Sequence, residues 1–209
     1  MSRRPPLELA GDRMRIEDNP DGSATITFDA KGTGRACGGC TLCCKLLPIL
    51  ELKKAAGTRC QHSRAGKGCM IYAHRPNACR TWACRWLADA DTAGMPRPDR
   101  AHYVIDMEWD YIEVQQNPGD PLQKQTVMQV WVDPAFPNAH RDPPLRAFMR
   151  HVAEKYRAAT VVRYGSRVGL VVIAPSMSAS GEWIESSPTI KSRTEEEDQI
   201  MRLVHVETK

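Results

Sequence analysis

All eight cysteines of this 209-residue chain lie between residues 37 and 84, and this clustering constrains the fold more than any other sequence feature. The N-terminus, MSRRPPLELAGDR, lacks the apolar core and cleavage site of a secretory signal, and no apolar run is long enough to span a membrane. We therefore expect a cytoplasmic protein in a reducing environment. There, clustered cysteines are typical of metal ligands, with disulfides and buried free thiols as the alternatives. The eight candidate ligands are Cys37, Cys40, Cys43, Cys44, Cys60, Cys69, Cys79 and Cys84.

The cysteine segment is also strongly basic. Residues 31–86 carry eleven Lys or Arg and one acid, Glu51, for a net charge of +10, so the rest of the chain carries −6. Such a charge can mark a nucleic-acid-binding face. The alternative is internal compensation, because metal-bound cysteines are thiolates and cationic neighbours favour the thiolate form. The basic residues are interleaved with the cysteines, which favours compensation and makes nucleic acid the weaker hypothesis.

The first half of the cluster is a compact CxxCxxCC motif, which runs from Cys37 to Cys44. A CxxC turn presents two sulfurs to one metal, and CxxCxxC adds a third at the same interval, as in ferredoxin-type loops. The adjacent Cys43 and Cys44 point in different directions on either a helix or a strand. One of the two is therefore expected to bind the metal, while the other serves a second centre or stays a buried thiol.

The second half of the cluster is looser and contains no CxxC pair. This spacing argues against two zinc ribbons built from paired knuckles. It leaves two arrangements open: one centre closed by a distal cysteine, or two centres that share both halves. The residues after Pro76 predict a helix, which would place Trp82 and Trp86 four residues apart against the cysteine layer.

The order of the cysteines and their neighbours resembles the bacterial CxxCxxCC family, also called YkgJ-type cysteine cluster proteins. The resemblance covers about residues 36–88. It implies chelation of zinc or iron through all eight cysteines and says little about activity. The pattern that carries it is Cys37-x2-Cys40-x2-Cys43-Cys44, then Cys60, then Gly68-Cys69-x2-Tyr72-x2-Arg75-Pro76-x2-Cys79-Arg80-x3-Cys84-x-Trp86-Leu87.

The identity of the metal depends on the ligand spacing. Four thiolates around zinc would form a closed structural site, whereas an iron–sulfur cluster would permit electron transfer or sensing. The CxxCxxC spacing favours the iron–sulfur cluster over zinc. His62 and His74 lie near cysteines but are more typical of side chains outside the ligand shell. Arg75, Arg80 and Arg85 could donate hydrogen bonds to cluster sulfurs or to carbonyls, although Arg85 equally suits a surface position with its charge in solvent.

Outside the cysteine segment, the sequence offers weaker functional signals. Asp106, Glu108 and Asp110 alternate along one predicted strand and could form a carboxylate site, but a solvated strand face is the more common arrangement. Tyr72 is expected in the core. No Ser/His/Asp triad, P-loop or Rossmann pattern is present. Whether the chain is an enzyme is left open.

The remaining sequence predicts an α+β fold, in which the cysteine-rich segment packs on a mostly antiparallel sheet of ββαββ order with one main helix. Asp142 is the expected N-cap of that helix, Pro143 suits its first position, and an apolar stripe runs from Leu145 to Tyr156. Gly165-Ser166 predicts a hairpin turn. Trp109 and Trp131 are core candidates. The predicted strands are 102–114, 126–132, 160–164 and 168–174.

Breaks in composition divide the chain into four regions. We expect an N-terminal arm with a small hairpin over 1–35, the metal-chelating region over 36–90, the α+β region over 91–175, and a tail over 176–209. Thr194 and Glu197 form a capping box in the tail, where a short helix or strand is expected near residues 200–206.

Three functions are compatible with these features. The first is a metal-binding protein that recognises an as yet unidentified protein partner. The second is a structural zinc module that binds nucleic acid or protein, and the third is a metal-dependent enzyme of redox or methyl-transfer chemistry. The cysteine pattern favours the first.

Overall fold

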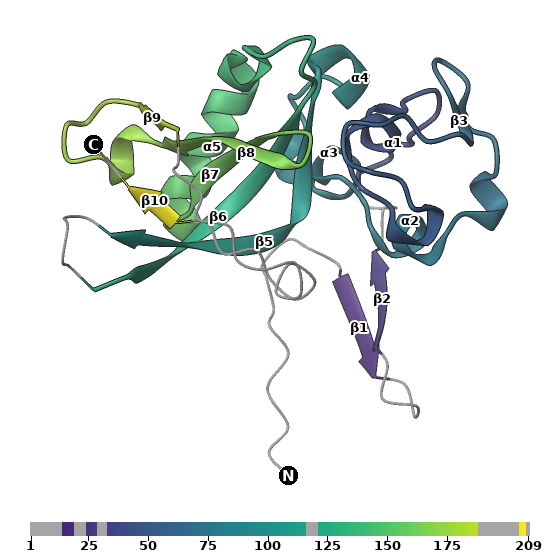
Figure 1. The fold of residues 1–209 in the computed structure, drawn as a ribbon, viewed down its shortest axis with the longest axis horizontal. Helices are drawn as coiled ribbons and strands as arrows, with labels where there is room; N and C mark the ends of the chain where they lie inside the picture. The colour runs from purple at the N-terminus through teal and green to yellow at the C-terminus, as the bar shows by residue number, and fades with distance from the viewer. Residues whose placement is uncertain (1–13, 19–23, 29–32, 116–120, 188–204, 208–209) are drawn as a thin grey trace.

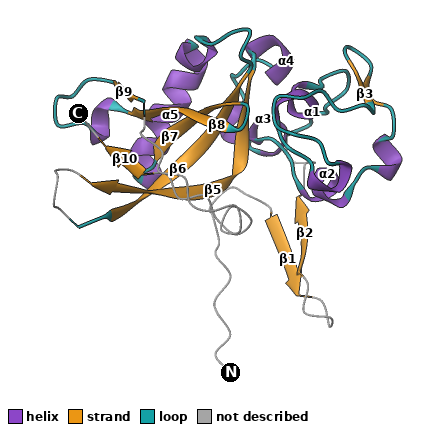
Figure 2. Cartoon of the chain, viewed as in Figure 1, coloured by secondary structure: helices purple, strands orange, loops and turns teal. Residues whose placement is uncertain are grey.

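The computed structural model describes residues 14–18, 24–28, 33–115, 121–187 and 205–207, and the fold is α+β as predicted. Figure 1 shows two parts side by side: a twisted sheet that carries one long helix, and a region of short elements that contains the cysteines. Strands dominate the first part, while loops and short helices dominate the second (Figure 2). No helix in the described ranges has the length and apolarity needed to cross a lipid bilayer.

The main sheet has six strands in the order β10-β5-β6-β7-β8-β9. The pairs β5–β6, β7–β8 and β8–β9 are antiparallel, so the sheet is mostly antiparallel as predicted, whereas β6–β7 and β10–β5 run parallel. Parallel neighbours need a crossover connection, and the main helix provides it between β6 and β7. The strands are β5 (Tyr103–Gln115), β6 (Gln123–Val132), β7 (Ala159–Tyr164), β8 (Arg167–Ile173), β9 (Ile184–Ser186) and β10 (His205–Glu207).

The long helix α5 (Pro143–Tyr156) packs its predicted apolar stripe against one face of this sheet. Leu145 and Met149 are among its fully buried side chains, and they join a core that continues into β6, β7 and β8. Asp142 is the N-cap residue, but its side chain makes no capping hydrogen bond. Its carboxylate instead accepts a hydrogen bond of 2.9 Å from the Tyr103 hydroxyl. This contact ties the start of α5 to the start of β5.

At one edge of the sheet, Glu185 of β9 forms ion pairs with arginines at and just before α5. Its carboxylate accepts hydrogen bonds from Arg141, at 2.6 and 3.2 Å, and from Arg146. These contacts lower the pKa of Glu185 to about 2, although partial burial opposes the shift. A carboxyl group whose pKa falls on folding stabilises the native state at neutral pH.

We expect Glu185→Gln to lower the melting temperature at pH 7 by about 2–4 °C. The difference from wild type should shrink as the pH falls from about 4.5 towards 2, because Glu185 then becomes protonated in the wild type as well. Thermal melts across this pH range test the prediction. Glu182→Gln is the matched control, since Glu182 is exposed in the same segment. A difference that persists unchanged at low pH would rule out the ion pairs as its cause.

The cysteine-rich region contains only short regular elements. Helices of four or five residues and strands of two residues cannot hold themselves together, so tertiary contacts must maintain their positions. Three turns of 3-10 helix, at Leu50–Leu52, Tyr72–His74 and Ala90–Thr92, connect them, and two more (Ala139–Arg141, Pro175–Met177) lie beyond. The elements are α1 (Leu42–Leu46), β3 (Ser63–Arg64), β4 (Gly68–Cys69), α2 (Asn77–Thr81), α3 (Arg85–Ala88) and α4 (Pro98–Ala101).

Helix α1 anchors this region to the sheet. Leu42 and Leu46 are buried in one cluster with Val104 of β5 and Trp131 of β6. On the same helix, the Lys45 ammonium lies 2.6 Å from an Asp133 carboxylate oxygen just after β6. Apolar burial and one ion pair therefore fix the motif that carries the first four cysteines. This is the packing of cysteine segment on sheet that the sequence predicts.

The predicted helix after Pro76 is wrong in its extent. Helix α2 ends at Thr81, the backbone at Trp82 and Cys84 is extended, and α3 begins at Arg85. Trp82 and Trp86 are therefore not on one helical face. The reason is a long-range contact, since the Trp82 indole N–H donates a 2.8 Å hydrogen bond to Asp106 on β5.

The N-terminal hairpin is present, with β1 (Met14–Asp18) antiparallel to β2 (Ala24–Phe28). Strand β10 falls at the end of the segment where a short helix or strand is expected. The arm over 1–12, the hairpin turn and the capping box of Thr194 and Glu197 lie outside the described residues.

Candidate metal centre

All eight cysteines line one cavity in the cysteine-rich region, with a volume of about 370 Å³. We call it the cysteine cavity. Its walls come from the CxxCxxCC motif, from the β3–β4 hairpin and from α2 and α3, and apolar side chains such as Leu47, Ile49 and Leu52 fill the gaps between the sulfurs. Residues far apart in the sequence thus converge on one space. No disulfide joins them, because all eight are free thiols.

The first knuckle, Cys37 to Cys40, is a tight turn in which the Cys40 amide donates a 2.8 Å hydrogen bond to the Cys37 carbonyl. Its two glycines press against the β3–β4 hairpin. A Cβ atom on Gly39 would lie 2.4 Å from the Gly66 carbonyl oxygen, and one on Gly68 would lie 2.4 Å from the Gly38 oxygen. These distances leave no room for a side chain, so the backbones of knuckle and hairpin interlock.

Three cysteines lie on the side of the cavity that faces the sheet. Cys84 is buried in the same apolar cluster as Leu42, Leu46 and the sheet residue Trp131, and Cys40 and Cys43 pack against this cluster. Burial raises the pKa of Cys84 to about 12, and the nearby thiols of Cys37 and Cys40 add to this shift. Without a metal, these thiols are therefore held in the protonated form.

The other wall is joined by backbone hydrogen bonds. The Cys60 amide donates a hydrogen bond of 2.8 Å to the Cys44 carbonyl. The Ser63 amide donates to the Cys60 carbonyl and so closes a turn. Ser63 is also the strand partner of Cys69 in the β3–β4 hairpin. Cys79 projects from α2. Burial raises the pKa of the Cys79 thiol, and the thiols of Cys44, Cys60 and Cys69 raise it further.

Cys43 and Cys44 are successive residues of α1 and differ in ionisation. The Cys43 thiol donates a hydrogen bond to Cys44, which raises the pKa of Cys43 and lowers that of Cys44 to about 7. Lys54 and Arg59 lower the pKa of Cys44 further. Cys44 is therefore the thiol with the lowest resolved pKa in the cavity and the one best prepared to act as a thiolate.

The basic charge of the segment is used in two ways. Lys54 is buried, acts electrostatically on Cys43, Cys44, Cys60 and Cys79, and donates a hydrogen bond to the Leu47 carbonyl. Arg75 lines the cavity and lowers the pKa of Cys37 and Cys79, in opposition to burial. In contrast, Lys53, Arg64, Lys67 and Arg80 are exposed. Some of the basic side chains therefore lie close enough to the cysteines to offset thiolate charge, and the others face solvent.

The predicted solvated strand face is wrong for Asp106, which is buried, and of the two alternatives for Arg85 the structure shows a buried side chain that donates to carbonyls. The Arg85 guanidinium donates to the carbonyls of Asp106 and Met107 and pairs with Asp89. The Asp106 carboxylate accepts hydrogen bonds from the indole N–H groups of Trp82 at 2.8 Å and Trp131 at 3.1 Å. We call this group the Asp106 clamp; it joins the wall of the cysteine cavity to β5 and β6. The alternation of acidic residues along β5 does not predict this buried group, because Trp82 and Arg85 come from a distant segment of the chain.

The other predicted residues fall in three places. His62 lines the cysteine cavity, whereas His74 does not. Tyr72 is not a core residue; it is 52% exposed at the cavity rim, with the Arg75 guanidinium 3.8 Å from its ring centre. Asp110 is half-buried and accepts a hydrogen bond from Gln129, and the side chain of Glu108 lies outside the described structure.

The eight cysteine sulfurs in the cavity are not arranged as the ligands of a single metal ion. Within the described ranges, no group of three or more His, Cys, Asp or Glu side chains is arranged to hold a metal ion. The eight thiols therefore share one space without converging on one point.

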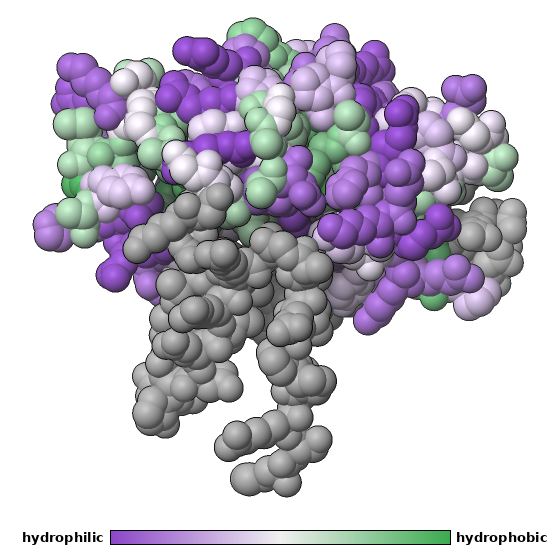
Figure 3. Space-filling view, turned by 180° about the vertical axis from the view of Figure 1, so that it is seen from behind, coloured by the Kyte–Doolittle hydropathy of each residue, from purple (hydrophilic) through white to green (hydrophobic). Residues whose placement is uncertain are grey.

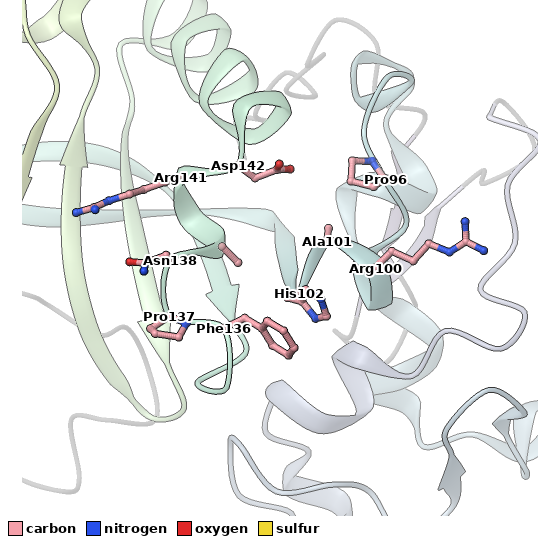
Figure 4. Close-up of a pocket in the computed structure, with 10 residues that line it drawn as sticks. Pro96, Arg100, Ala101, His102, Phe136, Pro137, Asn138, Arg141 and Asp142 are labelled. Atoms are coloured by element: carbon pink, nitrogen blue, oxygen red, sulfur yellow. The ribbon is translucent and has the colours of Figure 1, made fainter.

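A second hollow, of about 570 Å³, lies between α4 and the turn before α5 (Figure 4). The rings of His102 and Phe136 are stacked on its floor with their centres 3.5 Å apart. Arg100 and Arg141 extend from its two sides in opposite directions (Figure 4). Because its charged groups do not converge, this hollow is a weaker candidate than the cysteine cavity.

Comparison with known proteins adds no relative of this chain. No protein-family model, no curated protein and no solved structure matches it. The site must therefore be interpreted from its own residues.

Proposed function

We propose that this chain is a metal-binding protein that holds an iron–sulfur cluster in the cysteine cavity through its eight cysteines. The observation that carries the proposal is that thiols from four separate stretches of sequence line one cavity. A buried cysteine that only fills space can sit anywhere in a core, so packing alone does not require this convergence. The resemblance to the CxxCxxCC family rests on the same cysteines and remains a prediction.

The size of the cavity favours a cluster over a single zinc ion. Zinc holds its sulfurs at about 2.3 Å, so four zinc ligands lie roughly 4 Å from one another. The cavity of about 370 Å³, lined by all eight thiols, offers more space than one such four-sulfur site needs. When bound, an iron–sulfur cluster would supply one-electron transfer or redox sensing.

The chain's own residues would set the properties of such a centre. Lys54 and Arg75 offset thiolate charge. Leu47, Ile49 and Leu52 make part of the wall apolar, which limits access of water to the sulfurs. Exposed Leu50, Met70 and Tyr72 lie in the same region of the chain. Figure 3, seen from behind, shows hydrophobic residues in green among purple ones at the left edge of the molecule. Met, Tyr and Arg are enriched in protein interfaces, which supports a protein partner for this face.

A visible absorption spectrum with elemental analysis tests the proposal directly. The protein should be purified without oxygen and without a metal-affinity column. We expect a brown sample that contains iron and acid-labile sulfide. A colourless sample with stoichiometric zinc would replace the cluster with a structural zinc site, and free thiols with neither metal would overturn metal binding altogether.

A nucleic-acid-binding zinc module is the second candidate, and the exposed cations Arg64, Lys67 and Arg80 favour it. Binding through these residues predicts a steep salt dependence, because each phosphate contact releases a counterion. We expect at most weak binding of a mixed-sequence DNA duplex at 50 mM salt, and three phosphate contacts would weaken it by roughly 40-fold at 200 mM salt. Fluorescence anisotropy over this range, with Arg64→Glu/Lys67→Glu as control, checks it. Tight binding at 50 mM salt that falls steeply by 200 mM salt, and that Arg64→Glu/Lys67→Glu abolishes, would favour the second candidate.

A further inference from the structure

We propose that the rim of the cysteine cavity, here called the docking rim, binds an acidic segment of a partner protein. Exposed Leu50, Met70 and Tyr72 contact the apolar residues of that segment, and the exposed cations around them pair with its carboxylates. The inference rests on the proposed function in one respect, namely that this region meets a protein partner. It goes further by naming the chemistry of the partner and the residues that recognise it, and it does not require bound metal.

The apolar part of the docking rim follows the edge of the cysteine cavity, in the region of α1 and α2 (Figure 1). Leu50 is 85% exposed, although Ile49 and Leu52 of the same turn line the cavity. Met70 is 57% exposed between two cavity-lining residues, and Tyr72 lines the cavity itself. Three of the five large exposed hydrophobic side chains in the described ranges therefore lie at one opening. Such a concentration is typical of a contact surface, whereas single scattered apolar residues are not.

Contacts between the turns hold Leu50 and Tyr72 near the same end of α2. The Glu51 carboxylate accepts hydrogen bonds of 2.9 and 2.8 Å from the first two amides of α2, so the turn that carries Leu50 lies against this end. Just before α2, the Arg75 guanidinium stacks on the Tyr72 ring, and its Nε donates a hydrogen bond of 3.1 Å to the Tyr72 carbonyl. The two side chains are thus presented by one connected set of turns.

The cations of the docking rim lack acidic partners. Glu51 is the one acid among residues 31–86, and the amides of α2 already occupy its carboxylate. Four cations are exposed and form no ion pair with the described residues, namely Lys53, Arg64, Lys67 and Arg80. Two of them directly follow cavity-lining residues, and the other two lie on the β3–β4 hairpin. Unpaired positive charge beside exposed apolar side chains is complementary to an acidic partner.

Two features favour a protein over a nucleic acid on this surface. Nucleic acids are bound through cation–phosphate contacts and through bases that stack on aromatic rings, and Leu50 and Met70 serve neither purpose. The Tyr72 ring already stacks on Arg75, which leaves at most one face for a base. An acidic segment with side chains of the size of leucine uses the apolar and the cationic residues together.

Fluorescence anisotropy with a short labelled peptide, in which glutamates are interspersed with leucines, tests the inference. We expect binding at low salt that weakens as the salt concentration rises, because salt screens the pairing of exposed charges. Leu50→Ser/Met70→Ser should weaken binding by about tenfold. Lys53→Glu/Arg80→Glu should weaken it by about tenfold as well and remove most of the salt dependence.

Matched controls come from the sheet, where Leu122 and Arg167 are also exposed. Leu122→Ser and Arg167→Glu should leave the affinity for the peptide unchanged. A peptide with lysine in place of glutamate, or serine in place of leucine, should not bind. The inference is overturned if the glutamate–leucine peptide does not bind, or if Leu50→Ser/Met70→Ser binds it as tightly as the wild type.

Two further measurements on the same samples separate the alternatives. A mixed-sequence DNA duplex that binds more tightly than the peptide, with an affinity that Leu50→Ser/Met70→Ser leaves unchanged, would make the docking rim a nucleic-acid surface and overturn the inference. Elemental analysis gives the metal content. Peptide binding by a metal-free protein would contradict the metal centre alone, whereas a metal-loaded protein that does not bind the peptide would contradict this inference alone.

Discussion

Removal of the proposed metal is expected to unfold the cysteine-rich region while the six-stranded sheet stays folded. The region has no helix longer than five residues and no strand longer than two within its described part, so little besides tertiary contacts and bound metal can hold it. Structural zinc contributes on the order of 10 kcal/mol to the folding of small domains.

Hydrogen exchange read by mass spectrometry measures this effect. After treatment with a strong chelator and a reductant, the amides between Cys37 and Leu87 should lose protection, while those of β5 to β8 keep it. The sheet amides serve as the internal control for general denaturation. If the cysteine-rich region stays protected without metal, its fold depends on packing alone, and the metal has only a functional role.

Substitution of Asp106 is expected to cause the second-largest effect. Asp106→Ala leaves the indole N–H groups of Trp82 and Trp131 without their acceptor in a buried site, beside the buried Arg85. Loss of a buried, charge-assisted acceptor costs about 2–4 kcal/mol in the free energy of unfolding. Asp106→Asn should cost less, because its amide oxygen can still accept one of the two hydrogen bonds.

Chemical denaturation with tryptophan fluorescence gives the free energies. A double-mutant cycle with Trp82→Phe separates the hydrogen bond from the loss of volume: the cost of Asp106→Asn should be smaller when Trp82 is already Phe. Equal costs in both backgrounds would mean that the hydrogen bond between Trp82 and Asp106 contributes nothing to stability. The bound metal should also dissociate faster from Asp106→Ala, because Trp82 lines the cysteine cavity.

The sheet and its helix were predictable because their signals are local. Apolar residues alternate in β6 to β8 and recur every third or fourth residue in α5, and Asn, Gly and Pro mark the breaks between them. The parallel pairing of β6 with β7 has no such local signal. It follows from the placement of α5 as a crossover, which only the complete fold reveals.

The candidate site was predictable in its residues and not in its arrangement. Eight clustered cysteines identify the thiols, and the adjacency of Cys43 and Cys44 suggests that they diverge. The break between α2 and α3, by contrast, depends on a hydrogen bond from Trp82 to a strand far along the chain. The burial of Arg85 has the same origin, since its acceptors are backbone carbonyls of β5. Long-range polar contacts of this kind leave no periodicity in the sequence.

The interlocked backbones of the first knuckle and the β3–β4 hairpin impose an order on biosynthesis. Gly39 rests on the carbonyl of Gly66, and Gly68 on that of Gly38, so neither turn has its final neighbour until both have been made. A ribosome delivers the knuckle first. The nascent knuckle therefore leaves the exit tunnel with exposed thiols and without the shape that the hairpin gives it. If the cavity binds metal as proposed, a metal donor or a cluster-assembly scaffold can load it only after translation has passed the hairpin, so maturation would be a late event in the synthesis of this protein.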